Sequence, residues 1–222
     1  MFSNSQRIFA LLFSSSLAVP FPLRALETPL SDTAVREAYF LGQHHDEIYS
    51  DFLGRYGVAF PLPKTGPHVA SISFLTPYAL TAMYSNQRAG TYSAQQAQID
   101  HDRRPEIVRV VVQIWFTASY GEYIVQPADR GSYSSSGFTL RPRDFWRDFR
   151  MRVTQKDQLV IPANASGEPL LQCPDYGDCD LCGATLTFEY SASVFTADTV
   201  TILVTPPEGD PVSVDFDPAS LR

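Results

Sequence analysis

The spacing of apolar side chains changes once along the chain, from a helical period in the first half to a period of two in the second. Over residues 35–56 the apolar positions recur every three or four residues, as on one face of an amphipathic helix, at Val35, Ala38, Leu41, Ile48, Phe52 and Tyr56. Ser31 or Asp32 can cap this helix, and Gly42 can divide it into two pieces. His45 fills the gap in the apolar face, so we expect it to be partly buried.

Two more helices and one strand are predicted before residue 105. Thr76 and Pro77 are typical of an N-cap and a first helical position, and predict a helix that begins at residue 78. Ser93 and Gln96 fit a capping box, which predicts a second short helix. The apolar run over residues 69–76 indicates a strand ahead of these helices.

From Glu106 onward, apolar and polar residues alternate as they do along half-buried strands. The clearest inward face comprises Val108, Val110, Val112, Ile114 and Phe116, and three later strands repeat the pattern at Ala184, Leu186, Phe188 and Tyr190, at Val200, Ile202 and Val204, and at Val212, Val214 and Phe216. These elements predict an α+β fold, with an N-terminal helical section followed by a mostly antiparallel β-sheet or β-sandwich. We expect one α+β domain over residues 26–222, helical over 31–104 and β-rich over 105–222.

The first 25 residues resemble a secretory signal peptide in the order of their parts. A short basic start is followed by the apolar run 8–13 and by small residues, and cleavage is acceptable after Ala18 or Ala25. An uncleaved interfacial anchor or a buried helix is the alternative. A membrane span needs about 20 apolar residues, whereas serines 14–16 and two prolines interrupt this run. We therefore expect an exported protein, periplasmic, cell-surface or extracellular, without stable membrane insertion after cleavage.

Composition restricts the partners that the protein can have. Apolar residues make up 44% of the chain and aromatic residues 13%, enough for a β-rich core, while charged residues make up only 18%. The formal net charge is -7, and the best basic cluster, residues 101–104, contains its own aspartate. Nucleic acid is therefore not expected as a partner, because phosphate neutralisation needs a basic face.

Three thiols lie within ten residues, at Cys173, Cys179 and Cys182. In an exported protein this spacing favours one disulfide and one spare thiol. Cys173 could pair with Cys182 or with Cys179, and the sequence does not separate the two. A zinc site or redox-active thiols are the alternatives, although the second half-site that zinc would need is missing.

A loop of about 20 residues holds Tyr120, Tyr123 and Tyr133 among serines and glycines. Tyrosines on such a loop can stack on sugars or dock a protein. We interpret them as a candidate binding loop for an unidentified protein or carbohydrate partner.

No local catalytic motif stands out from the sequence. On one helix His44, Glu47 and Asp51 would share a side, but without the order of ligands found in zinc hydrolases, so a solvated polar face is the simpler reading. We assign no catalytic, cofactor-binding or metal-binding residue and expect no cofactor. The first hypothesis is an exported, non-enzymatic domain that either has a structural role or binds a ligand or a partner. The alternative is an exported hydrolase with a noncontiguous site around His44, His68 or His101, which three titratable groups converging in one pocket would favour.

Overall fold

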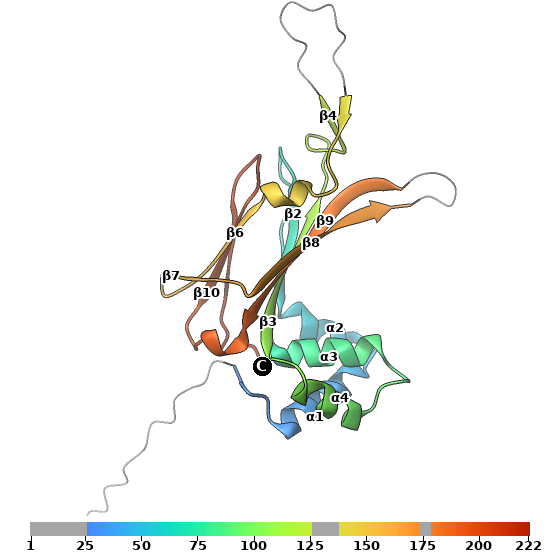
Figure 1. The fold of residues 1–222 in the computed structure, drawn as a ribbon, viewed down its shortest axis with the longest axis vertical. Helices are drawn as coiled ribbons and strands as arrows, with labels where there is room; N and C mark the ends of the chain where they lie inside the picture. The colour runs from blue at the N-terminus through green and yellow to red at the C-terminus, as the bar shows by residue number, and fades with distance from the viewer. Residues whose placement is uncertain (1–25, 126–137, 174–178) are drawn as a thin grey trace, which may run out of the picture.

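A computed structural model describes residues 26–125, 138–173 and 179–222. Its four α-helices gather at one end of the molecule, below two antiparallel sheets, and a narrow two-stranded ribbon projects from the opposite end (Figure 1). The helices are α1 (Asp32–Gly42), α2 (Glu47–Gly54), α3 (Pro77–Gln87) and α4 (Ala94–Asp102). The expected signal peptide, residues 1–25, lies outside the described residues.

The predicted caps of α3 and α4 are confirmed. The Thr76 hydroxyl accepts the Ala79 N–H at 3.2 Å, and the Ser93 hydroxyl accepts the Gln96 N–H at 3.1 Å. Each bond satisfies a donor that the first turn of a helix leaves without an intrahelical partner. The polar side chain at each of these positions therefore determines where its helix begins.

The expectation that His45 belongs to the apolar helical face is wrong. Residues 43–46 link α1 to α2, because Asp46 begins a new helix by accepting the Ile48 N–H at 3.1 Å. His45 is exposed in this link. The α1 helix ends at Gly42, where a Cβ atom would lie 2.2 Å from the Ala82 carbonyl oxygen. Glycine is needed there because α1 and α3 pack in direct contact.

The larger sheet has five strands in the order β1-β2-β3-β9-β8, and every neighbouring pair is antiparallel. Two of its strands, β1 and β2, come from between the helices, so this sheet joins the two halves of the chain. The bounds are β1 (Gly57–Ala59), β2 (His68–Leu75), β3 (Ile107–Trp115), β8 (Asn164–Gln172) and β9 (Asp180–Ser191).

The second sheet has four antiparallel strands in the order β11-β10-β6-β7. Its strands are β6 (Arg150–Gln155), β7 (Gln158–Val160), β10 (Val200–Thr205) and β11 (Val212–Phe216). The two-stranded ribbon consists of β4 (Tyr123–Val125) and β5 (Phe138–Leu140). Two short 3-10 helices are η1 (Phe145–Asp148) and η2 (Ala192–Val194). The predicted α+β class with mostly antiparallel sheets is confirmed, and the β-sandwich stays a prediction.

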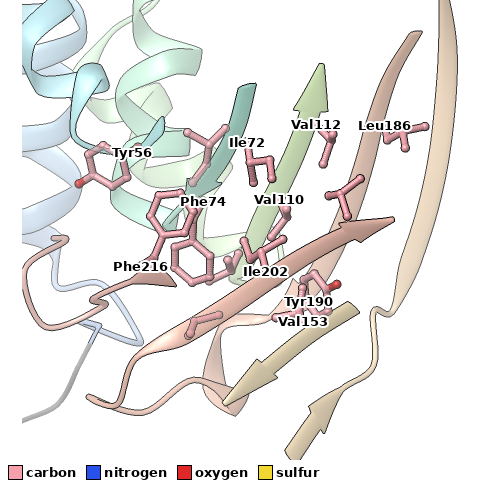
Figure 2. Packing of buried hydrophobic residues seen from close by; sticks show 14 of the residues in the cluster. Tyr56, Ile72, Phe74, Val110, Val112, Val153, Leu186, Tyr190, Ile202 and Phe216 are labelled. Atoms are coloured by element: carbon pink, nitrogen blue, oxygen red, sulfur yellow. The ribbon is translucent and has the colours of Figure 1, made fainter. Parts of the chain in front are cut away.

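Both sheets contribute to one apolar core. Val108, Val110, Val112 and Ile114 on β3 are fully buried, as the alternation predicts, and Phe116 lies just beyond the end of the strand. Ile202, on the inward face predicted for its own strand, belongs to β10 of the second sheet and packs into the same cluster (Figure 2). Phe74 of β2 stacks on Phe216 of β11 with ring centroids 5.6 Å apart and joins the sheets at one edge.

The sequence pattern does not predict strand β8, because it is an edge strand that contains a glycine and a proline and has only short apolar side chains in its first half. It pairs with β9 along its whole length. Gly167 gives it a role in packing, because a Cβ atom there would lie 2.3 Å from the Trp146 ring. The Trp146 indole packs against the strand at Gly167, because glycine has no side chain to occupy that space.

The core assignment predicts that two substitutions on paired strands lower the free energy of unfolding by different amounts. Ile114→Ala should lower the free energy of unfolding by about 2–5 kcal/mol, because it empties a packed aliphatic site. Thr187→Ala, on the outward face of β9, should lower it by less than about 0.5 kcal/mol. Urea unfolding measures both. Equal midpoints would show that the inward and outward faces are misassigned, since a shift of one residue exchanges them.

Candidate functional site

The predicted tyrosine loop is divided between the core and the surface. Tyr120 is only 1% exposed, which corrects its assignment to a partner-binding surface. Its ring lies under the Arg141 guanidinium, 3.5 Å from ring centroid to guanidinium carbon, and packs beside Phe145. Tyr123 is exposed on β4, and Tyr133 lies outside the described residues. Sequence reasoning could not separate Tyr120 from Tyr123, because both stand in the same polar context.

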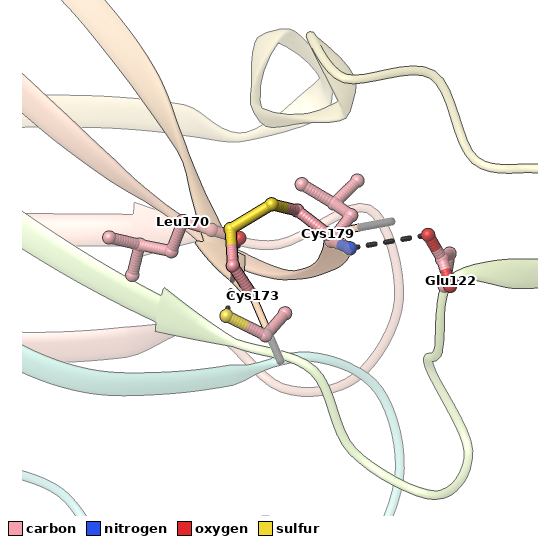
Figure 3. The surroundings of a disulfide bond; sticks show 6 residues. Glu122, Leu170, Cys173 and Cys179 are labelled. Carbon is pink, nitrogen blue, oxygen red and sulfur yellow. Dashed lines mark hydrogen bonds between the residues drawn. A yellow bond between two sulfur atoms is a disulfide. The ribbon is translucent and has the colours of Figure 1, made fainter. Parts of the chain in front are cut away.

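Cys173 and Cys179 form the disulfide, so of the two pairings that the sequence leaves open, this one is present (Figure 3). It links the facing ends of β8 and β9. Cys182 is free and half-buried, and its Sγ lies 3.2 Å from the Leu170 carbonyl oxygen. Burial raises the pKa of this thiol, which disfavours the reactive thiolate.

The histidines of the hydrolase hypothesis belong to different parts of the fold. His44 is exposed beside Asp46 in the link between α1 and α2, and the His68 ring contacts the Phe60 carbonyl oxygen at the start of β2. His101 lies on α4. In the described part of the chain, no group of three or more His, Cys, Asp or Glu side chains is placed to hold a metal ion.

A cleft of about 450 Å³ lies between α3, α4 and the start of β3. Side chains at helical spacing form its two walls, with Leu80 and Tyr84 on α3 and Ala97 and His101 on α4. Leu80 and Ala97 are buried and give the cleft an apolar interior. Other lining residues used below are Arg88, Asp100, Arg104, Glu106, Ile107, Arg109 and Glu189.

Asp100 is the centre of a polar network on one wall of the cleft. Its carboxylate accepts hydrogen bonds from Gln96 at 2.7 Å, Tyr92 at 3.1 Å and Arg88 at 3.2 Å. The Arg104 guanidinium lies 3.9 Å from the same carboxylate. The hydrogen bond from Gln96, together with those from Tyr92 and the two arginines, holds the pKa of Asp100 below its ordinary value despite partial burial.

Both arginines beside Asp100 are also held by aromatic rings. The guanidinium of Arg104 lies over Tyr84 at 5.2 Å from the ring centroid, and that of Arg88 lies over Tyr92 at 5.4 Å. Such stacking orients the planar guanidinium group. Two oriented cations therefore share one carboxylate.

A second ion pair lies where β3 and β9 meet the cleft. The Arg109 guanidinium donates to Glu189 at 2.8 Å and to the Tyr84 hydroxyl at 3.3 Å. Burial alone would lower the pKa of Arg109, but the hydrogen bonds with Glu189 and Tyr84 raise it, so the cation is retained.

His101 and Glu106 form the border between this cleft and a neighbouring hollow. The His101 Nε2 atom lies 3.3 Å from the Glu106 carboxylate, which also accepts the Leu30 N–H at 2.5 Å. Ser191 and Ser193 line the neighbouring hollow, and their hydroxyls hydrogen-bond to each other at 2.8 Å. Among the described residues, no hydrogen bond connects these serines to His101.

The sequence pattern contained part of this site. Ala97, Asp100, His101 and Arg104 have the spacing of one helical face, but the cluster 101–104 drew attention only as a weak basic patch. Nothing in the sequence indicated that Arg109 and Glu189, far apart along the chain, would pair across the register of β3 and β9.

Comparison with protein-family models and with curated proteins finds no match for this chain. None of the described helices is both long enough and apolar enough to cross a membrane. The geometry of the cleft is therefore the main guide to function.

The network at Asp100 predicts a pH-dependent contribution to stability. A carboxyl group whose pKa is lowered in the folded state stabilises the fold above its unfolded pKa of about 3.9, and this contribution is lost as the pH falls through the native pKa. Asp100→Asn should therefore cost about 1 kcal/mol at pH 7, and the difference from wild type should shrink toward pH 3.

Urea unfolding at the two pH values measures the effect. Asp51→Asn is the control, since Asp51 is exposed on α2 and makes no hydrogen bond within the described residues; it should leave stability unchanged at both. An Asp100→Asn defect of the same size at pH 3 and pH 7 would contradict the ionised network.

Proposed function

We propose that this is an exported, non-enzymatic binding protein, and that the cleft between α3 and α4 takes a small organic anion with an apolar body. The observation that carries the proposal is the pair of oriented guanidinium groups, Arg88 and Arg104, that share the single carboxylate of Asp100 above an apolar interior.

The lining of the cleft holds three arginines and three carboxylates, so the positive surplus that favours an anionic ligand is local to Asp100. Glu106, at the border of the cleft, contacts His101 and accepts the Leu30 N–H. Arg109 and Glu189 neutralise each other in a direct ion pair. Arg88 and Arg104 face only one carboxylate, and about half of each side chain is exposed. A ligand carboxylate would supply the second negative charge. Because the guanidinium groups are already oriented by Tyr92 and Tyr84, binding would immobilise little additional side chain.

The size and the interior of the cleft favour a small molecule with an apolar body. A volume of about 450 Å³ is within the usual range of small-molecule sites, which combine an apolar lining with a few polar groups that fix orientation. The buried Leu80 and Ala97 can contact the apolar part while the arginines contact the anion.

Export is part of the proposal, supported by the pattern of the first 25 residues and compatible with the disulfide. Removal after Ala18 or Ala25 would leave every described residue in the mature protein.

One observation favours a hydrolase as the second candidate. Asp100, His101 and Glu106 are three titratable groups that line the same cleft. However, the His101 ring faces Glu106, and the nearby serines bond to each other instead of to His101. Without a nucleophile hydrogen-bonded to its base, binding is the better-supported function.

Calorimetry with 3-phenylpropionate and its neutral amide tests the proposal. The carboxylate should bind to wild type with saturation, and the amide at least about tenfold more weakly, because it lacks the charge that completes the pairing with Arg88 and Arg104. Arg104→Gln should weaken binding of the carboxylate by a similar factor. Arg103→Gln is the matched control, since Arg103 is exposed on the adjacent position and does not line the cleft.

Equal affinities for acid and amide, or equal effects of the Arg103 and Arg104 substitutions, would contradict the anion site. Hydrolysis of 4-nitrophenyl butyrate that His101→Gln abolishes would replace the binding function with the hydrolase.

A further inference from the structure

The ribbon of β4 and β5, here called the arm, carries an unusually apolar exposed face. The register pairs Tyr123 with Leu140, and Phe138 lies two residues from Leu140 on the same side. Their side chains are 60%, 59% and 70% exposed. An isolated two-stranded ribbon is marginally stable in water. A face made of one tyrosine, one leucine and one phenylalanine fits a protein surface better than a sugar.

The base of the arm is held firmly on the domain. The Arg141 Nε–H donates to the Gly121 carbonyl oxygen at 2.9 Å, and the Arg141 guanidinium covers the buried Tyr120 ring. Glu122 accepts the Leu181 N–H at 3.2 Å and so connects the arm to β9. The arm projects away from the sheets (Figure 1). Its apolar face is thus exposed and does not belong to the core cluster of its own chain.

A groove of about 580 Å³ lies at the same end of the molecule, between the loop after β1 and the loop that joins β10 to β11. We call it the proline groove, since its lining includes Pro61, Leu62, Pro63, Pro67, Pro206 and Pro211. Leu62 is 69% exposed. Proline rings present a rigid apolar surface without N–H donors. The groove therefore offers apolar contacts from its prolines and Leu62, beside the charged side chains of Lys64, Glu208 and Asp210 that also line it.

Hydrogen bonds place the proline groove beside the base of the arm. The Gly66 N–H donates to the Ser119 hydroxyl at 2.9 Å, and the Thr117 hydroxyl donates to the Gly66 carbonyl oxygen at 2.7 Å. A projecting apolar face and the proline groove thus adjoin on one surface. That is the arrangement a two-fold symmetric contact needs, because each copy then gives its arm and receives the other.

We propose that the arm of one chain docks in the proline groove of a second copy, and that the reciprocal contact forms a closed homodimer. Covering three large side chains on each of two arms, with a matching area of groove, would bury on the order of 1,200 Å², the lower end of the range for specific interfaces. The dimer should therefore dissociate measurably on dilution.

Sedimentation velocity of the purified protein over a concentration series tests this contact. Wild type should shift from monomer to dimer as concentration rises. Phe138→Ser in the arm and Leu62→Ser in the groove should each weaken the dimer at least tenfold, because each removes a large apolar side chain from one side of the contact. Leu159→Ser is the matched control, since Leu159 on β7 is 60% exposed and belongs to neither surface; it should leave association unchanged.

Mixing the two variants gives a second readout. A mixed dimer keeps one intact arm and one intact groove that face each other, so the mixture should associate more strongly than either variant alone. All three substituted positions are exposed in the monomer, so circular dichroism should show unchanged folding.

Three results would overturn the proposal. A wild type that stays monomeric at every concentration would show that no such contact forms. A Leu62→Ser variant that dimerises normally while Phe138→Ser does not would show that arms pair with arms. A dimer insensitive to both would place the interface elsewhere.

Discussion

The alternation of side chains along β3 is the constraint on which the rest of the structure depends. Alternate residues of a strand point to opposite faces. Val108, Val110, Val112 and Ile114 therefore enter the core, while Ile107 and Arg109 reach the cleft beneath α3 and α4. Because β3 lies between β2 and β9, it connects strands from both halves of the chain. A slip of one residue would bury Arg109 and expose the valines.

The cleft is a consequence of how the helices are fixed on this sheet. Gly42 lets α1 pack closely on α3, and Asp100 ties α4 to Arg88 just beyond the end of α3. Glu189 lies opposite Arg109 in the register of β9, and their ion pair fixes the Arg109 side chain at the floor of the cleft. The charged groups are paired with each other in the absence of a ligand, so the buried polar groups of the network have hydrogen-bond partners. One more cation than carboxylate remains beside Asp100.

Sequence reasoning could predict the elements whose pattern is local. The caps at Thr76 and Ser93 and the inward residues of β3, β9 and β10 follow from side chains close in sequence. It missed β8, because an edge strand with a glycine and a proline lacks the clear alternation of a half-buried one, and it misplaced His45, because Asp46 begins a new helix. It also assigned Tyr120 to the surface, although Arg141 and Phe145, distant in sequence, cover its ring. The cleft depends on such distant pairings, above all that of Arg109 with Glu189.

The proposed anion site and the arm lie at opposite ends of the molecule (Figure 1). This separation leaves the cleft open whether or not the arm is covered. The most direct test of the account is a titration of ¹⁵N-labelled protein with 3-phenylpropionate, followed by backbone amide chemical shifts. We expect saturable shifts concentrated in α3, in α4 and at residues 104–109, with the arm and the proline groove unaffected. Saturable shifts centred elsewhere, or no shifts at millimolar ligand, would contradict the assignment of the cleft as the binding site.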